Sequence, residues 1–353
     1  MSEKVLMKGN EAIAEAAIVA GCRHYFGYPI TPQTEIAAYM AKKMPKIGGT
    51  FLQAESEIAA INMVYGVSST GKRVMTSSSS PGISLKGEGL SYMAGCDLPA
   101  LVVNVQRGGP GLGGIQPSQS DYFQSTRGGG HGDYHMIVLA PASVQEMAEL
   151  TVKGFELADE YGITSMILAD GTIGQMMEPV SLDFDLKPMP EKPWATTGTK
   201  MAREHNITNS LSLVPEELEK FNFARYEKYK KIEENECRYE EYMTEDADII
   251  LCAFGIAARV SKNAVNEARS KGIKVGLIRP ITLWPFPKAP FAKAATHAKA
   301  FISVELSMGQ MIEDIKLSTE CKVPVYLCNR AGGMIPNPKM VMDMIEKVKA
   351  GEN

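Results

Sequence analysis

Three polar residues stand where buried strands are expected to end. Thr31 lies between two prolines, Glu57 opens an apolar helix, and Arg107 precedes a run rich in glycine. A hydroxyl, a carboxylate and a guanidinium can bind a small polar ligand and hold or move its protons. These residues are the first candidates for function.

The segment at residues 27–32 reads Gly-Tyr-Pro-Ile-Thr-Pro and directly follows a predicted strand. Its two prolines fix the backbone and leave the Thr31 hydroxyl on a rigid loop. The alternative is an ordinary turn between a strand and a helix, since Tyr-Pro and Thr-Pro steps also form such turns.

Glu57 and Arg107 each have a functional and a structural interpretation. An acid at position 57 would lie at the carboxyl edge of a sheet, where open α/β folds bind ligands, but it could instead complement the helix dipole. Arg107 suits a carboxylate ligand because a guanidinium donates two parallel hydrogen bonds. Its alternative is an ion pair with a neighbouring acid.

Three other patterns carry less weight. Residues 66–73 resemble a phosphate-binding loop, but a helix precedes and a strand follows, the reverse of the required order. His131 and His135 follow the Gly-Gly-Gly run at residues 128–130, which argues against a helix and favours a structural role over a metal site. Asp170 resembles the start of a magnesium–diphosphate motif, but no Asn-Asn pair follows, so its carboxylate is expected to cap a strand end. The sequence therefore predicts no metal ligands in this chain.

The elements that position these residues form an α/β pattern. From about residue 8 to residue 170, strand-like and helical segments alternate, which predicts a doubly wound parallel sheet with helices on both faces. A first helix is expected from Asn10, a candidate N-cap, to about residue 20. The predicted strands are residues 24–27, 50–53, 73–76, 100–105, 136–139 and 164–168.

The pattern predicts two units and a connector. Residues 1–180 form the first domain, residues 181–245 a linker with a charged, solvated helix, and residues 246–353 a smaller α/β domain. The strands expected in the smaller domain are residues 247–255, which end in a turn, and residues 275–279, 300–304 and 323–327.

Composition narrows the function classes. A net charge of −4 without a basic block gives no support to a nucleic-acid partner. No apolar stretch reaches the length of a membrane span, and residues 1–7 lack the core of a signal peptide, so we expect a cytoplasmic protein without membrane contact. Six cysteines occur without a CxxC pair, which argues against zinc and iron–sulfur sites here.

Taken together and in this order, the three sites resemble the α subunit of the 2-oxoacid:ferredoxin oxidoreductases, over nearly the whole chain. The matching segments are Tyr-Pro-Ile-Thr-Pro at residues 28–32, Ser-Glu at residues 56–57 and the Arg-to-Gly-Pro run at residues 107–110. The resemblance implies a thiamine-diphosphate pyrimidine-binding domain, followed from about residue 246 by a domain like the transketolase C-terminal domain.

The resemblance also implies roles for residues. Glu57 would hydrogen-bond the aminopyrimidine ring of thiamine diphosphate, and Tyr28, Pro29 and Ile30 would line the cofactor. A carboxylate at position 57 favours the imino tautomer of the ring, which then takes a proton from the thiazolium carbon. Thr31 and Arg107 would hold the keto and carboxylate oxygens of the substrate.

In the family, other chains complete the enzyme. A β subunit binds the diphosphate and magnesium, γ and ferredoxin-like subunits accompany it, iron–sulfur clusters pass electrons to ferredoxin, and coenzyme A receives the acyl group. The resemblance therefore implies that this chain supplies half of a thiamine site.

The loop after Arg107 bears on the substrate. Residues 107–113, with the Pro-Ser-Gln-Ser-Asp-Tyr segment at 117–122, look like the branched-chain type acting on 3-methyl-2-oxobutanoate. The 2-oxoglutarate type tends to carry Gly-Pro-Ser-Thr-Gly, where this chain has Gly111-Leu112. A 2-oxoglutarate enzyme and a non-catalytic scaffold subunit remain the alternatives.

Overall fold

The computed structural model describes residues 4–351 and contains a large and a small parallel sheet. The large sheet has the strand order β12-β6-β7-β5-β4-β2-β3, and all of its strands are parallel except the edge strand β12. Its strands are β2 (His24–Gly27), β3 (Thr50–Gln53), β4 (Val74–Ser78), β5 (Ala100–Gln106), β6 (Ile137–Leu139), β7 (Thr164–Asp170) and β12 (Thr282–Trp284). Every residue of β4, β5 and β7 is buried, as expected of central parallel strands.

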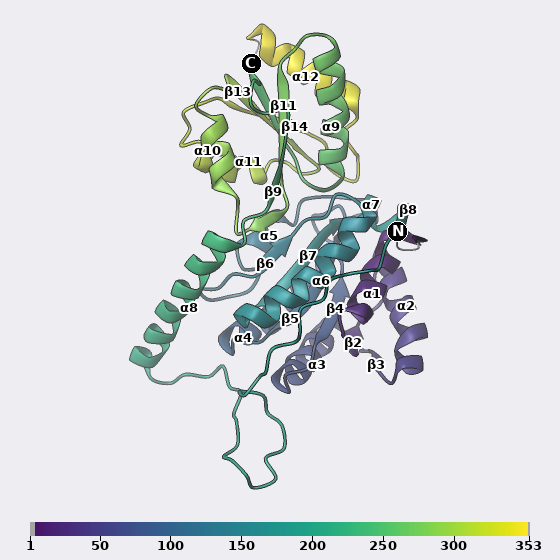
Figure 1. Ribbon diagram of the computed structural model, residues 1–353, viewed down its shortest axis with the longest axis vertical. Coiled ribbons are helices and arrows are strands. Elements are labelled where there is room, and N and C mark those ends of the chain that lie inside the picture. The colour runs from purple at the N-terminus through teal and green to yellow at the C-terminus, as the bar shows by residue number, and fades with distance from the viewer. Residues whose placement is uncertain (1–3, 352–353) are drawn as a thin grey trace.

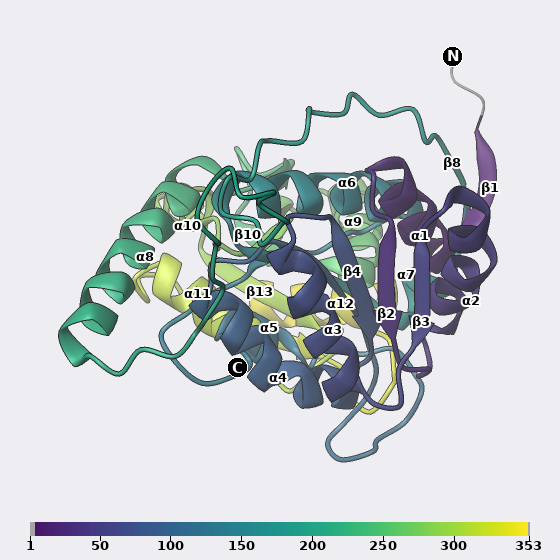
Figure 2. The same cartoon turned by 90° about the horizontal axis from the view of Figure 1, so that it is seen from below.

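Helices cover both faces of the large sheet. In Figure 2 the strands lie between α3 and α4 on one side and α1 and α6 on the other. The first unit contains α1 (Gly9–Val19), α2 (Thr34–Lys43), the 3₁₀ helix η1 (Met44–Ile47), α3 (Glu57–Ser69), α4 (Pro81–Gly95), α5 (Tyr122–Thr126), α6 (Val144–Tyr161) and α7 (Gly171–Gln175). A separate antiparallel pair is formed by β1 (Val5–Lys8) and β8 (Met177–Val180).

A long connector follows the first unit. Residues 181–214 contain neither helix nor strand and form the open loop below the sheet in Figure 1. Helix α8 (Pro215–Asn235) then buries only Arg225, Tyr229 and Ile232, so most of its charged surface faces solvent.

The smaller unit is a five-stranded sheet in the order β14-β13-β10-β11-β9. Its strands are β9 (Tyr239–Tyr242), β10 (Ile249–Cys252), β11 (Val275–Pro280), β13 (Ala300–Glu305) and β14 (Val325–Asn329), with β9 antiparallel to β11. The helices are α9 (Gly255–Ser270), α10 (Lys288–Ala294), α11 (Met311–Ser318) and α12 (Pro338–Ala350). The structure confirms the predicted fold, a doubly wound parallel sheet with a smaller α/β unit (Figure 1).

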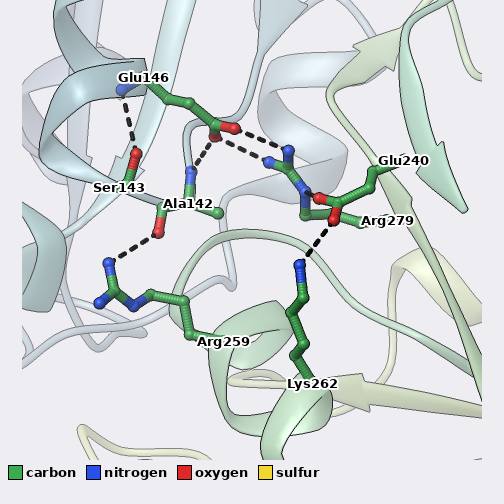
Figure 3. Close-up of polar contacts among 7 residues, drawn as sticks. All are labelled: Ala142, Ser143, Glu146, Glu240, Arg259, Lys262 and Arg279. Atoms are coloured by element: carbon green, nitrogen blue, oxygen red, sulfur yellow. Dashed lines mark hydrogen bonds and ion pairs between the residues drawn. The ribbon is translucent and has the colours of Figure 1, made fainter. Parts of the chain in front are cut away.

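An ion-pair network around the buried Arg279 side chain joins the two units (Figure 3). Arg279 of β11 binds both carboxylate oxygens of Glu146 of α6 at 2.7 and 2.8 Å and also pairs with Glu240 of β9 at 2.9 Å. Lys262 binds Glu240 at 2.8 Å, and Arg259 donates to the Ala142 carbonyl at 3.3 Å. Because the Arg279 side chain is buried, these pairs fix the small unit against the large sheet.

One local expectation was wrong. Asn10 is not the N-cap of α1, which begins at Gly9 with Lys8 in the capping position. The Asn10 side chain instead donates to the Pro32 carbonyl and to Glu35, both at 2.8 Å. The amide is therefore used to hold the turn that contains Thr31. Among residues 4–351 no helix combines the length and apolarity needed to cross a bilayer.

Candidate active site

The carboxyl ends of four neighbouring strands, β5, β4, β2 and β3, form the edge of the large sheet that holds the candidate residues. The loop at Thr31 follows β2, Glu57 follows β3, and Arg107 follows β5. These strands are parallel, and β4 lies between β2 and β5. The three residues thus share the edge at which open α/β sheets bind ligands.

Glu57 is the first residue of α3 and is almost fully buried. Ser56 caps the helix by accepting a hydrogen bond from the Ala59 amide at 3.2 Å. The Glu57 carboxylate lies against Gly82 of α4, where an added Cβ atom would come within 2.5 Å of its Oε1 atom. Only glycine therefore leaves room for this carboxylate.

The Glu57 carboxylate has no hydrogen-bond donor among the residues that the structure describes. It accepts no side-chain or backbone donor within residues 4–351, although the side chain is only 5% exposed. The Ser78 hydroxyl also borders Gly82, is buried, and has no partner there either. Unpaired buried polar groups are costly, so this corner of the sheet edge is suited to a polar ligand.

Arg107 and Thr31 are in direct contact. The Arg107 guanidinium donates to the Thr31 carbonyl at 3.0 Å and to the Leu112 carbonyl at 2.9 Å, while its buried Nε has no acceptor. No ion pair involves Arg107 within the described residues, although its positive charge acts on the nearby carboxylate of Asp121. Thr31 itself is exposed at the rim.

Buried polar contacts fix the loop that carries Thr31. The Ser77 hydroxyl donates to Gln33 at 2.6 Å and contacts the Tyr25 hydroxyl at 2.7 Å, which ties the loop to β2 and β4. Tyr28 and Pro29 are exposed and Ile30 is half-buried, so the residues predicted to line the cofactor form the outer rim of the edge.

Asp121 was not identified from the sequence. Its half-buried carboxylate accepts hydrogen bonds from Ser80 at 2.6 Å and Asn104 at 2.9 Å, and desolvation raises its pKa. The Ser80 hydroxyl also accepts from the Arg107 amide at 3.0 Å, so Asp121 orders the turn that places Arg107. A cavity of about 530 Å³ opens between this turn and the smaller unit, and Met308 lies on its far wall.

Lys86 is the second residue that sequence reasoning missed. It is fully buried on α4, and its Nζ lies 3.5 Å from the Glu57 carbonyl. Burial lowers its pKa to about 8. Gly82, Lys86 and Gly89 recur at helical spacing and lie on the buried side of α4, but the spacing alone does not show that the lysine is buried.

The remaining motifs have structural partners. Arg73, in the segment resembling a phosphate loop, pairs with Asp159 at 2.7 Å, and the segment contains the last turn of α3 and ends just before β4. His135 stacks on Trp284 with ring centroids 4.6 Å apart, and His131 is exposed.

Asp170 caps helix starts at the end of β7, as its position predicted. Its carboxylate accepts from the Thr172 and Ile173 amides of α7 at 3.1 Å and from the Ile256 amide of α9 at 2.8 Å. It therefore links the two units rather than facing a ligand.

Comparison with known proteins places these features in a family. The family model described as pyruvate flavodoxin/ferredoxin oxidoreductase, thiamine diphosphate-binding, matches residues 15–244, and pyruvate:ferredoxin oxidoreductase core domain II matches residues 247–341. The chain is 52% identical to the ketoisovalerate oxidoreductase subunit VorB of Methanothermobacter marburgensis, covering 99% of this chain and 98% of that protein. It is 35% identical to the 2-oxoglutarate synthase subunit KorA of Methanothermobacter thermautotrophicus, covering 99% of this chain and all of that protein.

Solved structures agree. The 2-oxoglutarate:ferredoxin oxidoreductase from Magnetococcus marinus superposes with a TM-score of 0.85 at 31% identity, covering 98% of this chain and 65% of that chain. A split-gene transketolase shares the fold, with a TM-score of 0.59 at 13% identity and full coverage of both chains. This chain belongs to the 2-oxoacid:ferredoxin oxidoreductase family, as the subunit type that joins a thiamine diphosphate-binding domain to core domain II.

Proposed function

We propose that this chain is the pyrimidine-binding subunit of an enzyme that oxidatively decarboxylates 3-methyl-2-oxobutanoate, forms the branched acyl-CoA and reduces ferredoxin. The observation that carries the proposal is the buried Glu57 carboxylate without a donor, at the sheet edge that also holds Thr31 and Arg107. The two relatives at 52% and 50% identity, both named ketoisovalerate oxidoreductase subunits, support the choice of substrate.

The residues at the edge fit the aminopyrimidine of thiamine diphosphate. Glu57 would exchange a proton with a ring nitrogen. The unpaired Ser78 hydroxyl borders Gly82, as the Glu57 carboxylate does, and would offer the ring a second polar group. Tyr28, Pro29 and Ile30 would border the ring from the rim. When bound, thiamine diphosphate supplies the carbon that attacks the keto group and the electron sink after carbon dioxide leaves.

Arg107 and Thr31 would orient the substrate. The unpaired Nε of Arg107 and the exposed Thr31 hydroxyl can bind the carboxylate and keto oxygens. The two carbonyl contacts of Arg107 hold its guanidinium in place before the substrate arrives, which lowers the entropic cost of positioning.

Partner chains would supply the remaining functions. The sequence has no magnesium–diphosphate motif, and no cluster of metal-binding side chains occurs in residues 4–351. We therefore assign the diphosphate and magnesium to a β subunit and electron transfer to iron–sulfur clusters on further subunits, with coenzyme A as acyl acceptor. All six cysteines are free, which suits a cytoplasmic enzyme.

The domain division stays part of the proposal. We place the pyrimidine-binding domain at residues 1–180, the linker with its charged helix at 181–245, and the transketolase C-terminal-like domain at 246–353. The matched family models, which meet between residues 244 and 247, support the second boundary.

The test is ferredoxin reduction by the assembled complex carrying Glu57→Gln. We expect at least a 100-fold loss of kcat, because the amide cannot exchange a proton with the ring. Glu55→Gln is the matched control, since Glu55 lies two residues away in the same loop but is exposed, and it should retain near-normal activity. Full activity of the Glu57 variant would reject the catalytic role and favour the scaffold alternative.

The substrate assignment has its own test. The wild-type complex is assayed with 3-methyl-2-oxobutanoate and with 2-oxoglutarate under identical conditions. A higher kcat/KM for the branched acid is expected, because the loop presents the apolar Leu112 side chain, which is 82% exposed in this chain. Faster turnover of 2-oxoglutarate would overturn the assignment while leaving the reaction class intact.

A further inference from the structure

Lys86 is a buried ammonium without an ion-pair partner. Its side chain has no solvent exposure, and its one hydrogen bond within residues 4–351 runs to the Glu57 carbonyl at 3.5 Å. A lysine ammonium has three donors and is costly to bury without compensation. A stable fold that retains a buried charge at this cost indicates that the position of the ammonium has a function.

The packing of α3 on α4 directs Lys86 toward Glu57. Gly82 and Gly89 flank Lys86 on the side of α4 that faces α3, and an added Cβ atom at Gly89 would come within 2.5 Å of Ile61. These glycines let the helices approach closely, which seals the lysine side chain between them. Gly82 and Lys86, one turn apart on α4, therefore both lie against Glu57. Gly82 borders its carboxylate, and the Lys86 ammonium lies near its carbonyl.

Glu57 is the carboxylate whose charge acts on Lys86. The Coulombic attraction of Glu57 opposes the effect of burial on the lysine. The glycine-rich loop over α4 contributes only backbone where Gly129 and Gly130 meet Gly87. Glu88, the acid nearest in sequence on α4, is exposed and bonds to Tyr92.

The positive end of α3 adds to the same field. Glu57 occupies the first turn of this helix, where the aligned peptide dipoles favour a negative charge. The carboxylate thus has no hydrogen-bond donor among residues 4–351 but lies in a region made positive by the helix start and by Lys86. Such a field acts on the charge of Glu57 while leaving its oxygens open to a ligand.

We propose that Lys86 is the positioning residue of Glu57, whose buried ammonium holds the carboxylate against Gly82 until the aminopyrimidine ring binds. This inference rests on the proposed function of Glu57. Lys86 touches no substrate or cofactor in this scheme and acts through Glu57 alone.

The pH profile of the assembled complex provides the first test. Lys86→Met removes a positive charge beside Glu57 at similar side-chain length, so the acid limb of kcat/KM should shift to higher pH by about half a unit or more. Lys86→Arg keeps the charge and should shift the acid limb by less. Lys72→Met, at an exposed lysine, is the control and should follow the wild type.

A double-mutant cycle without cofactor provides the second test. The full chain carrying Glu57→Gln, Lys86→Met or both is unfolded in urea at pH 7 and at pH 9.5. We expect an attractive coupling of at least fivefold in the unfolding equilibrium constant at pH 7. It should fall toward one at pH 9.5, because Lys86 has then lost its proton.

The outcomes separate the two proposals. An equal loss of activity at every pH with no coupling would make Lys86 merely structural and overturn the inference, and so would an unchanged pH profile. If Lys86→Met does not fold, the pH dependence of unfolding of Glu57→Gln provides the test. The inference requires that this variant lower the pH at which Lys86 releases its proton. No change in that pH would overturn the inference. Activity that survives Glu57→Gln would reject the proposed function instead.

Discussion

The two sheets differ in how many hydrogen bonds a buried carboxylate accepts at their carboxyl edges. Glu305, at the end of β13 in the small sheet, is 1% exposed and accepts five hydrogen bonds, from the hydroxyls of Ser303 and Ser307 and the amides of Gln310, Met311 and Ile312 at 2.7 to 3.2 Å. Glu57, after β3 in the large sheet, is almost as buried and accepts none within residues 4–351.

The difference separates structural from functional use of the same position. The Glu305 oxygens cap the start of α11, so this carboxylate at the edge of the small sheet is hydrogen-bonded within the chain. Glu57 leaves its oxygens available and relies on a nearby charge and a helix start. A sheet edge that leaves buried polar groups unpaired is the one prepared for a ligand.

The largest expected stability effect is at Glu305. Glu305→Gln should lower the free energy of unfolding of the full chain by about 4 kcal/mol, because five donors lose a charged acceptor. Glu57→Gln should cost only about 1 kcal/mol. Urea unfolding at pH 7 measures both, and equal losses would break the contrast between the two edges.

The pH dependence of stability sharpens the comparison at Lys86. Its pKa is lowered from 10.5 to about 8 by burial, so between these values the unfolded chain binds more protons than the folded chain. The stability of the wild type relative to Lys86→Met should therefore rise with pH from about 8 to 10.5, by about 3 kcal/mol. Thermal or urea unfolding across this range follows the difference, and a flat difference would show that burial does not lower the pKa of Lys86.

The smallest expected effect compares two serines. Ser78→Ala should leave the stability of the full chain unchanged or raise it by about 0.5 kcal/mol, because its buried hydroxyl has no partner. Ser303→Ala should cost about 1 kcal/mol, because its hydroxyl donates to Glu305 at 2.7 Å. The two values are read from the same urea titrations. A larger loss at Ser78 would mean that its hydroxyl is already satisfied.

Strand ends could be predicted from the sequence because burial and alternation fix them locally. Residues 24–27 and 50–53 were predicted as strands and form β2 and β3 with the same bounds. Since parallel strands end at a common edge, Thr31 and Arg107 were expected together, and they are in contact. Their roles toward substrate stay predictions.

Long-range packing could not be predicted in the same way. β12, at residues 282–284, leaves the small unit and pairs with β6 of the large sheet, and its short run carries no sign of that partner. The side chain of Lys86 looks like a solvated lysine until α3 and α4 are packed through Gly82 and Gly89. Asn10 was mistaken for a cap because its true partner, Pro32, is distant in sequence.

The most direct measurement is the structure of the assembled enzyme with thiamine diphosphate bound. A Glu57 carboxylate oxygen is predicted about 3 Å from a ring nitrogen of the aminopyrimidine, with Gly82 behind it and Arg107 and Thr31 facing the same cleft. An aminopyrimidine held by another carboxylate, with Glu57 beyond hydrogen-bond reach, would contradict the central claim.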